Sequence, residues 1–177
     1  LMSTQRGFIK KTALTEYNSA RKTGLQAITL KEDDELIAVR LTDGQDNVVL
    51  VTEEGMSITF SEQDVRPMGR TAQGVIGIKL AEDDKVIGME SIISGANATL
   101  LAITENGFGK RTDLEEYRIQ NRGGRGVITY KVTQKTGKLV GIRVTDDSND
   151  IMMITDTGTI IRINVKDVSV LGRSTQG

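Results

Sequence analysis

Short runs rich in Val, Ile and Leu recur along the 177 residues, and polar segments that contain glycine separate them. Helical periodicity is weak throughout, so the runs predict short β-strands. Only residues 12–17 and 112–117 have a pattern compatible with a turn of helix. The chain is therefore predicted to be all-β.

Two glycine positions repeat in phase. Thr-x-x-Gly occurs four times, with its glycine at positions 7, 55, 107 and 158. A second glycine follows 17 residues later in the first unit and 19 residues later in the others, at 24, 74, 126 and 177. Two glycine positions that recur together at nearly constant spacing indicate a repeated sequence unit. The repeat units start near residues 4, 52, 104 and 155, and residues 1–177 are predicted to be part of a single domain.

Each unit of about 50 residues contains four predicted strands. The first follows the second glycine, at 25–30, 75–80 and 127–132, and the second follows a turn, at 36–41, 86–91 and 139–144. The third and fourth flank Thr-x-x-Gly, at 48–51, 99–103 and 151–154 and at 8–11, 57–60, 108–111 and 159–163. The Thr-x-x-Gly segment is predicted to be a hairpin turn with positive φ at glycine. Four antiparallel strands per unit are typical of a propeller blade, which gives about three and a half blades and a piece of a longer array.

The net charge of −1 hides two opposite charge populations. Segments 8–24, 56–74, 108–126 and 159–177 hold 14 Lys/Arg and 7 Asp/Glu, whereas the rest of the chain holds 9 and 17. Because equivalent positions of each repeat lie at the same place on each blade, these segments predict a basic rim. Phosphate recognition depends on local potential, so the rim predicts binding of duplex DNA. Aromatic residues make up 3% of the chain, which argues against stacking on single strands.

The candidate phosphate contacts lie in these segments. They are Lys10, Lys11, Arg21, Lys22, Arg66, Arg70, Lys110, Arg111, Arg118, Arg122, Gly123, Gly124, Arg125, Arg162 and Arg173. The glycines are expected to allow close backbone approach and to donate N–H groups to phosphate. For three of the arginines a structural role is the alternative: Arg70 and Arg173 holding the loop through carbonyl groups, and Arg162 in a cross-strand pair.

No catalytic or metal site is predicted. Cysteine and histidine are absent, which removes thiol chemistry, Cys/His zinc sites and the commonest general base. Tyr17 and Tyr117 lack an activating partner and are interpreted as packing residues. The acidic pairs at 33–34 and 83–84 are interpreted as turns, and Asp43 and Asp46 lack the spacing of a calcium loop. No run of about 18 apolar residues and no leader is present, so the cytoplasm is the expected compartment.

The segment Gln120-Asn121-Arg122-Gly123-Gly124-Arg125-Gly126 resembles the basic, glycine-rich box of the DNA gyrase A subunit, with asparagine where that family has arginine. TENGFGKRT, LEEYR, RPMGRTAQGVIGIKL and VLGRSTQG are also similar to the C-terminal domain of that family. The resemblance implies a β-pinwheel, a propeller variant whose blades exchange strands and whose basic perimeter wraps duplex DNA during ATP-driven negative supercoiling. Its implied partners are the rest of the gyrase A subunit and the gyrase B subunit, in an A2B2 assembly. It also implies a bacterial nucleoid location, no membrane, and ATP and Mg²⁺ used only elsewhere in the enzyme.

Two alternatives stay open. One is the related domain of topoisomerase IV, in its own A subunit. The other is a protein-binding propeller scaffold, in which the basic rim would meet an acidic partner surface.

Overall fold

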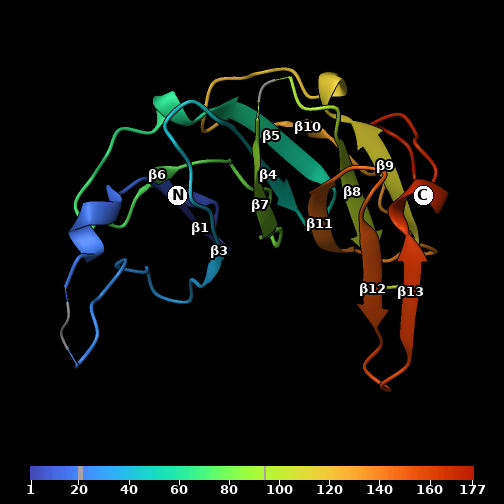
Figure 1. Ribbon diagram of the computed structural model, residues 1–177, viewed down its shortest axis with the longest axis horizontal. Coiled ribbons are helices and arrows are strands. Elements are labelled where there is room, and N and C mark those ends of the chain that lie inside the picture. Colours follow the sequence, from blue (N-terminus) through green and yellow to red (C-terminus); the bar gives the residue numbers. More distant parts are fainter. Residues whose placement is uncertain (20–21, 94) are drawn as a thin grey trace.

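The computed structural model describes residues 1–19, 22–93 and 95–177 as four antiparallel sheets that follow one another around an arch (Figure 1). The sheets, called here blades one to four, have the strand orders β3-β1-β2-β6, β10-β5-β4-β7, β11-β8-β9 and β12-β13. The strands are β1 (Met2–Thr4), β2 (Phe8–Lys10), β3 (Leu36–Val39), β4 (Asn47–Thr52), β5 (Met56–Ser61), β6 (Val75–Ile76), β7 (Val86–Ile92), β8 (Thr99–Thr104), β9 (Gly109–Asp113), β10 (Val127–Ile128), β11 (Leu139–Thr145), β12 (Asp150–Ile154) and β13 (Ile160–Asn164). The predicted all-β fold is confirmed.

The Thr-x-x-Gly segments are the hairpin turns. In blade two, the Gly55 N–H donates to the Thr52 carbonyl at 3.1 Å, and the Thr52 hydroxyl accepts from the Met56 N–H at 3.1 Å. The other three turns have the same pair of bonds. The four hairpin glycines have φ between 81° and 86°, a region that glycine adopts without strain. Threonine and glycine therefore recur at this spacing because each completes the same turn.

Neighbouring blades exchange strands. After hairpin β4–β5 of blade two, the chain forms β6 on the edge of blade one, beside β2, and then returns as β7 beside β4. The next unit repeats this path, because β10 pairs with β5 of blade two and β11 pairs with β8 of blade three. The outer strands β6 and β10 are thus each supplied by the following unit.

Most predicted strands are confirmed to within two residues, but the first strand of each unit is shorter than expected. It covers two residues in β6 and in β10, and residues 25–30 form none. Among the described residues, no strand pairs with residues 25–30. The prediction for 25–30 is wrong because a strand needs its ladder partner as well as an apolar sequence.

Four single turns of 3-10 helix follow the hairpins: η1 (Leu14–Tyr17), η2 (Glu62–Asp64), η3 (Leu114–Glu116) and η4 (Val165–Asp167). The first and third confirm the predicted turns of helix. The other two were missed, although the side chains of Ser61 and Asn164 cap them by accepting the N–H groups of Gln63 and Lys166.

Two apolar clusters lie on the two sides of blade two. Val48 and Leu50 of β4 pack into one cluster with Phe60, and Val49 and Val51 pack into the other with Tyr130. Alternate side chains of a strand point to opposite faces, so β4 joins both clusters. All four β4 residues are 0% exposed.

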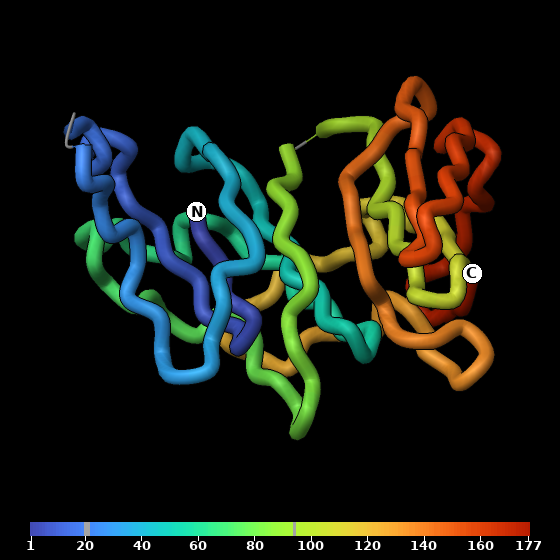
Figure 2. Tube along the Cα trace, turned by 90° about the horizontal axis from the view of Figure 1, so that it is seen from below, coloured from blue at the N-terminus to red at the C-terminus, as the bar shows by residue number. Residues whose placement is uncertain are grey.

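The acidic turns lie on one side of the arch. Figure 2 shows turns 32–35 and 82–84 extending to the same side. Asp33 and Asp83 have φ of 55° and 60°, and Asp84 accepts the Lys85 and Glu54 N–H groups at 2.8 and 3.2 Å. Asp34 makes the matching bonds in the first unit. These aspartates therefore act as turn residues, as the sequence predicts.

Candidate functional site

The candidate site is a row of loops on the outer side of the arch (Figure 1). These perimeter loops, residues 62–74, 114–126 and 165–177, run from the end of each hairpin to the second glycine. Each loop docks on the segment that follows the second glycine of the preceding unit. The Gly123 N–H donates to the Gly77 carbonyl and the Lys79 N–H donates to the Gly124 carbonyl, both at 2.8 Å.

The second glycines permit this docking. A Cβ at Gly126 would lie 2.1 Å from the Ser57 carbonyl oxygen, and one at Gly74 would lie 2.6 Å from the Ile9 carbonyl oxygen. Their φ values of 78° and 96° also favour glycine. The second anchor of the repeat is therefore the point at which one unit crosses onto the blade of another.

Several predicted cations are exposed on the perimeter. Arg66 and Arg118 lie eight residues before their second glycines, and both are exposed. Lys22, Gly124 and Arg125 are also exposed. The described structure gives none of these cations an ion-pair partner. Their positive charge is available to an anionic ligand.

Sequence reasoning missed two further cations on the same side. Lys79 and Lys131 each lie five residues after a second glycine, just past β6 and β10, and both are exposed. The Lys131 N–H donates to the Thr175 carbonyl at 3.0 Å, so it lies against the next perimeter loop as Lys79 does. Their equivalent positions after the second glycine can be seen in the sequence, but both lysines lie outside the segments that predict the basic rim.

The predicted phosphate contacts at Lys10 and Lys110 are wrong for this structure, because both side chains are buried. Lys10 is 0% exposed, and its ammonium donates to the Ala27 and Arg70 carbonyls. The Lys110 ammonium donates to the Gly172 and Arg173 carbonyls, each at 2.7 Å. Burial lowers the pKa of both lysines, for Lys110 to about 8. They hold the perimeter loops from beneath.

Arg111 and Lys11 share this supporting role, which contradicts the expectation of free cations. The Arg111 side chain is buried, donates to the Val168 carbonyl at 2.8 Å and pairs with Asp147 at 2.5 Å. The half-buried Lys11 donates to the Glu62 carbonyl at 2.8 Å.

Four other predicted phosphate contacts form hydrogen bonds or ion pairs within the protein. Arg70, Arg122 and Arg173 donate to the carbonyls of Gln26, Ile76 and Ile128. Arg162 pairs with Asp150 of the neighbouring strand, which confirms the cross-strand alternative.

Two predicted residues remain. The Gly123 N–H is occupied by the Gly77 carbonyl, so the expected donation from Gly123 to phosphate is wrong here. Arg21 lies outside the described residues.

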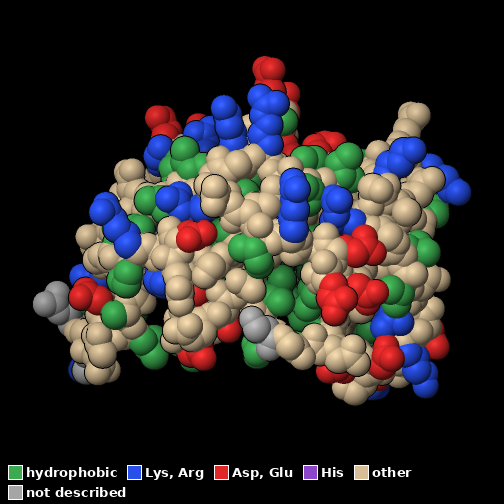
Figure 3. All heavy atoms as spheres, turned by 90° about the horizontal axis from the view of Figure 1, so that it is seen from above, with side chains coloured by type: hydrophobic (Ala, Val, Ile, Leu, Met, Phe, Trp, Pro, Cys, Tyr) green, Lys and Arg blue, Asp and Glu red, His purple; other side chains and the backbone are tan. Residues whose placement is uncertain are grey.

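Charge on the outer surface is mixed. Figure 3 views this surface from above and shows Lys and Arg side chains across its whole width, with Asp and Glu among them. Exposed acidic residues include Asp64, Asp113, Glu115 and Glu116. The segregation of charge is thus less complete than the repeat phase predicts.

Tyr117 is a packing residue. Its side chain is 5% exposed and its hydroxyl shares a 2.5 Å hydrogen bond with the Thr129 hydroxyl. Burial raises the pKa of Tyr117, which disfavours the phenolate.

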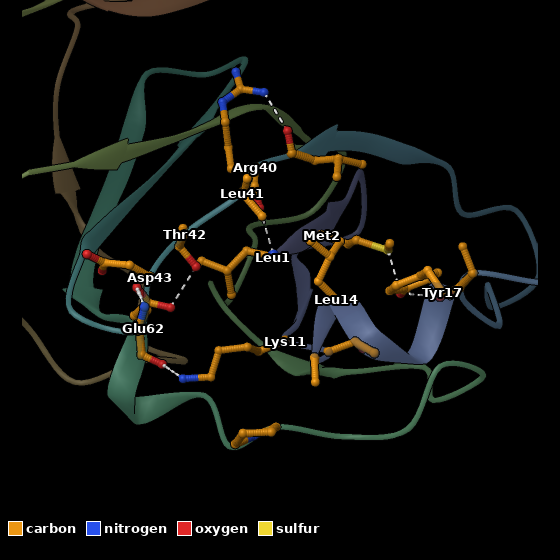
Figure 4. A pocket seen from close by; sticks show the side chains of 16 residues that line it. Leu1, Met2, Lys11, Leu14, Tyr17, Arg40, Leu41, Thr42, Asp43 and Glu62 are labelled. Atoms are coloured by element: carbon orange, nitrogen blue, oxygen red, sulfur yellow. Dashed lines mark hydrogen bonds between the residues drawn. The ribbon is translucent and has the colours of Figure 1, made fainter. Parts of the chain in front are cut away.

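Tyr17 lines a cavity of about 680 Å³ at the blade-one end of the arch (Figure 4). Its hydroxyl faces the Met2 sulfur and the Ala27 carbonyl. Leu1 and Leu14 contribute to the apolar part of the lining. These contacts place no general base beside the phenol.

Three carboxylates also gather beside this cavity. Oxygens of Asp43, Asp46 and Glu62 lie within 4.8 Å of one another. The buried Glu62 carboxylate accepts the Thr42 hydroxyl at 2.8 Å and the Gly44 and Asp46 N–H groups at 2.9 Å. These bonds fix loop 42–46. Burial, followed by the nearby charges of Asp43 and Glu62, raises the pKa of Asp46.

No helix within residues 1–19, 22–93 and 95–177 is long and apolar enough to cross a membrane.

Comparisons with known proteins agree on one family. Residues 1–43, 46–93, 98–146 and 149–177 match the family model described as DNA gyrase C-terminal domain, beta-propeller. The DNA gyrase A subunit of Salmonella typhimurium is 49% identical over 176 residues, which cover 99% of this chain and 20% of that protein. The corresponding protein of Staphylococcus epidermidis is 44% identical over 177 residues, again 20% of its length.

Solved structures share the fold. The C-terminal domain of DNA topoisomerase IV superposes with a TM-score of 0.94 at 32% identity, covering 100% of this chain and 55% of that one. The DNA gyrase A C-terminal domain gives 0.89 at 28% identity, covering 100% and 59%. Both identities are lower than the 49% and 44% shared with the gyrase A subunits of Salmonella typhimurium and Staphylococcus epidermidis. With its hairpin turns, exchanged strands and matched repeats, the chain belongs to the DNA gyrase C-terminal domain family of β-propellers.

Proposed function

We propose that this chain binds duplex DNA without sequence preference and bends it around the outer side of the arch. The observation that carries the proposal is the repetition of exposed cations in phase. Arg66 recurs as Arg118, and Lys79 recurs as Lys131, one unit further along. Exposed cations at equivalent positions of units two and three fit a ligand whose charge also recurs along a path.

Duplex DNA is such a ligand, because it carries one negative charge per roughly 1.7 Å of helix axis. Contacts spread over successive blades would make the duplex follow the arch. Bending 20–30 base pairs by 40–90° costs on the order of 1–6 kcal/mol, and several charge-assisted phosphate contacts can offset that cost.

In this proposal the chain serves a gyrase A subunit. It presents wrapped DNA to the remaining parts of an A2B2 assembly, which include the gyrase B subunit. It thereby supports negative supercoiling in the bacterial nucleoid. Strand cleavage, ATP and Mg²⁺ belong to other parts of the enzyme.

A salt titration with duplexes of unrelated sequence tests the proposal. If six exposed cations contact phosphate, the observed binding constant should fall with a log–log slope of about −5 against salt concentration. Replacing Arg118 and Arg125 by glutamate should weaken binding to every sequence alike. A control that replaces the exposed Lys135 of the turn before β11 by glutamate should change affinity much less.

A flat salt response would overturn the proposal. Capture of an acidic protein by a chain that does not bind duplex DNA would favour the scaffold alternative. A change in plasmid linking number, in the presence of a nicking-closing enzyme, would separate wrapping from simple binding.

A further inference from the structure

We infer that three arginines set the step between neighbouring perimeter loops, and with it the curvature of the DNA path, rather than holding phosphates. They are Arg70, Arg122 and Arg173, each four residues before a second glycine. The inference rests on the proposed function and assigns a positioning role within the same surface.

The three guanidinium groups make the same bond. In each, Nη1 donates to the carbonyl of the second residue after the preceding unit's second glycine. Those carbonyls belong to Gln26, Ile76 and Ile128, which lie one unit apart. Three copies of one bond, in one phase, indicate a feature of the repeat rather than a chance contact.

The bond spans two units at an exposed sheet edge. Ile76 and Ile128 lie in β6 and β10, the edge strands of blades one and two, and among the described strands none lies beside their outward carbonyls. An arginine from the next perimeter loop caps each of these two carbonyls. Arg122 also donates through Nε to the Asp64 carbonyl at 3.2 Å, so its planar fork holds two parts of unit two at once.

Burial separates these arginines from the other cations of the same loops. Arg70, Arg122 and Arg173 are half-buried, whereas Arg66, Arg118 and Arg125 are exposed. A guanidinium that contacts phosphate through Nη1 would have to release its carbonyl. The exposed cations can meet phosphate at no such cost.

The guanidinium–carbonyl bond sets the spacing between successive perimeter loops. The perimeter loop that contains Arg122 also holds the Gly123–Gly77 and Lys79–Gly124 backbone bonds and the exposed Arg125. Without the guanidinium bond, the loop can shift relative to Lys79, and the cations of successive blades lose their alignment. The number of phosphate contacts on a short duplex need not change, but the bend imposed on a longer duplex should decrease.

The test compares Arg122→Gln with Arg125→Gln, two charge removals in one loop of the full-length protein. For R122Q we expect an unchanged salt slope on a short duplex. We also expect a loss of at least about a third of the end-to-end energy-transfer change on a duplex long enough to follow several blades. For R125Q we expect the slope to become shallower by about 0.9, as for one lost phosphate contact, with the energy-transfer change at saturation retained. The reverse pattern would overturn the inference.

A readout without DNA separates this inference from the proposed function. R122Q should raise the hydrogen-exchange rate of the Lys79 amide about tenfold, and R125Q should leave it unchanged. An unaltered Lys79 rate in R122Q would overturn the inference even if DNA binding is confirmed. If the wild-type protein shows no salt-dependent DNA binding, the proposed function falls instead. Should R122Q fail to fold, R122K, which keeps the charge without the planar fork, should show the same gain in exchange and the same loss of bending.

Discussion

Hairpins β4–β5 and β12–β13 occupy the same place in units two and four, yet they differ in what surrounds them. Residues 48–51 of β4 are 0% exposed. In the other hairpin, Met152 is 61% exposed and Ile154 is 65% exposed. Both hairpins are apolar, and both close with the same Thr-x-x-Gly turn. The difference lies in the neighbouring strands.

Blade two is complete because other units complete it. β7 pairs with β4, β10 pairs with β5, and an apolar cluster lies on each face. Among the described residues, β12 and β13 pair only with each other. A hairpin sequence therefore supplies apolar surface, whereas burial of that surface comes from segments about one repeat away.

Substitution of two equivalent isoleucines should give the largest difference in the free energy of unfolding. Ile58 and Ile161 both lie three residues after the hairpin glycine, but Ile58 is 0% exposed and Ile161 is 48% exposed. In the 177-residue chain, Ile58→Ala should lower the free energy of unfolding by about 2–5 kcal/mol. Ile161→Ala should cost less than about 1 kcal/mol, because partly exposed sites leave little cavity. Urea denaturation measures both, and equal losses would contradict the comparison.

Two glycines test how the exchanged strand reaches blade two. Gly126→Ala places a Cβ 2.1 Å from the Ser57 oxygen at a φ of 78°, and it should cost about 2–4 kcal/mol through strain and overpacking. Gly158→Ala has nothing within 4 Å of its Cβ at a φ of 86°, so it should cost only about 1–2 kcal/mol. Thermal unfolding of the two variants supplies the measurement. A Gly158 variant as unstable as the Gly126 variant would show that φ alone decides the cost.

The tyrosine of unit three gives a smaller effect. Tyr117→Phe removes the 2.5 Å bond to Thr129 and should lower the free energy of unfolding by about 1 kcal/mol. Tyr17→Phe removes a longer bond, 3.3 Å to the Ala27 carbonyl, at a half-buried site and should cost less. DNA affinity should survive both changes. Loss of binding on either substitution would contradict the assignment of these tyrosines to packing.

A pH dependence is expected at Lys110, which holds the position that Ile58 holds in unit two. Burial lowers the pKa of Lys110 from 10.5 to about 8 in the folded chain. Between these two values the unfolded chain binds a proton that the folded chain has released, so folded stability from this group rises with pH from about 8 to 10.5. The free energy of unfolding of the wild type should therefore increase relative to Lys110→Met over that interval. The exposed Lys22→Met serves as control, and parallel profiles for wild type and K110M would refute the prediction.

The sequence was sufficient for the repeat, the hairpins and the exchanged-strand family, because Thr-x-x-Gly and the second glycine each satisfy a local backbone requirement. Residues 25–30 show the limit, since their apolar sequence lacks a ladder partner among the residues that the structure describes. The site was predictable only in part. Lys10 and Lys110 resemble surface cations because they follow a turn, and nothing local reveals that carbonyls of a loop about 60 residues later surround them. Lys79 and Lys131, in contrast, could be found by extending the phase comparison past the second glycine.

Strand exchange has a mechanical consequence. A ligand that pulls on the perimeter beside β6 acts on a segment hydrogen-bonded to blade one, while the same segment continues covalently into β7 of blade two. Force applied at one blade is therefore shared with its neighbour through the polypeptide itself. Removing a single repeat would likewise leave two blades without a strand. An array built this way can therefore gain or lose a repeat only if strand pairing is formed again on both sides of the change.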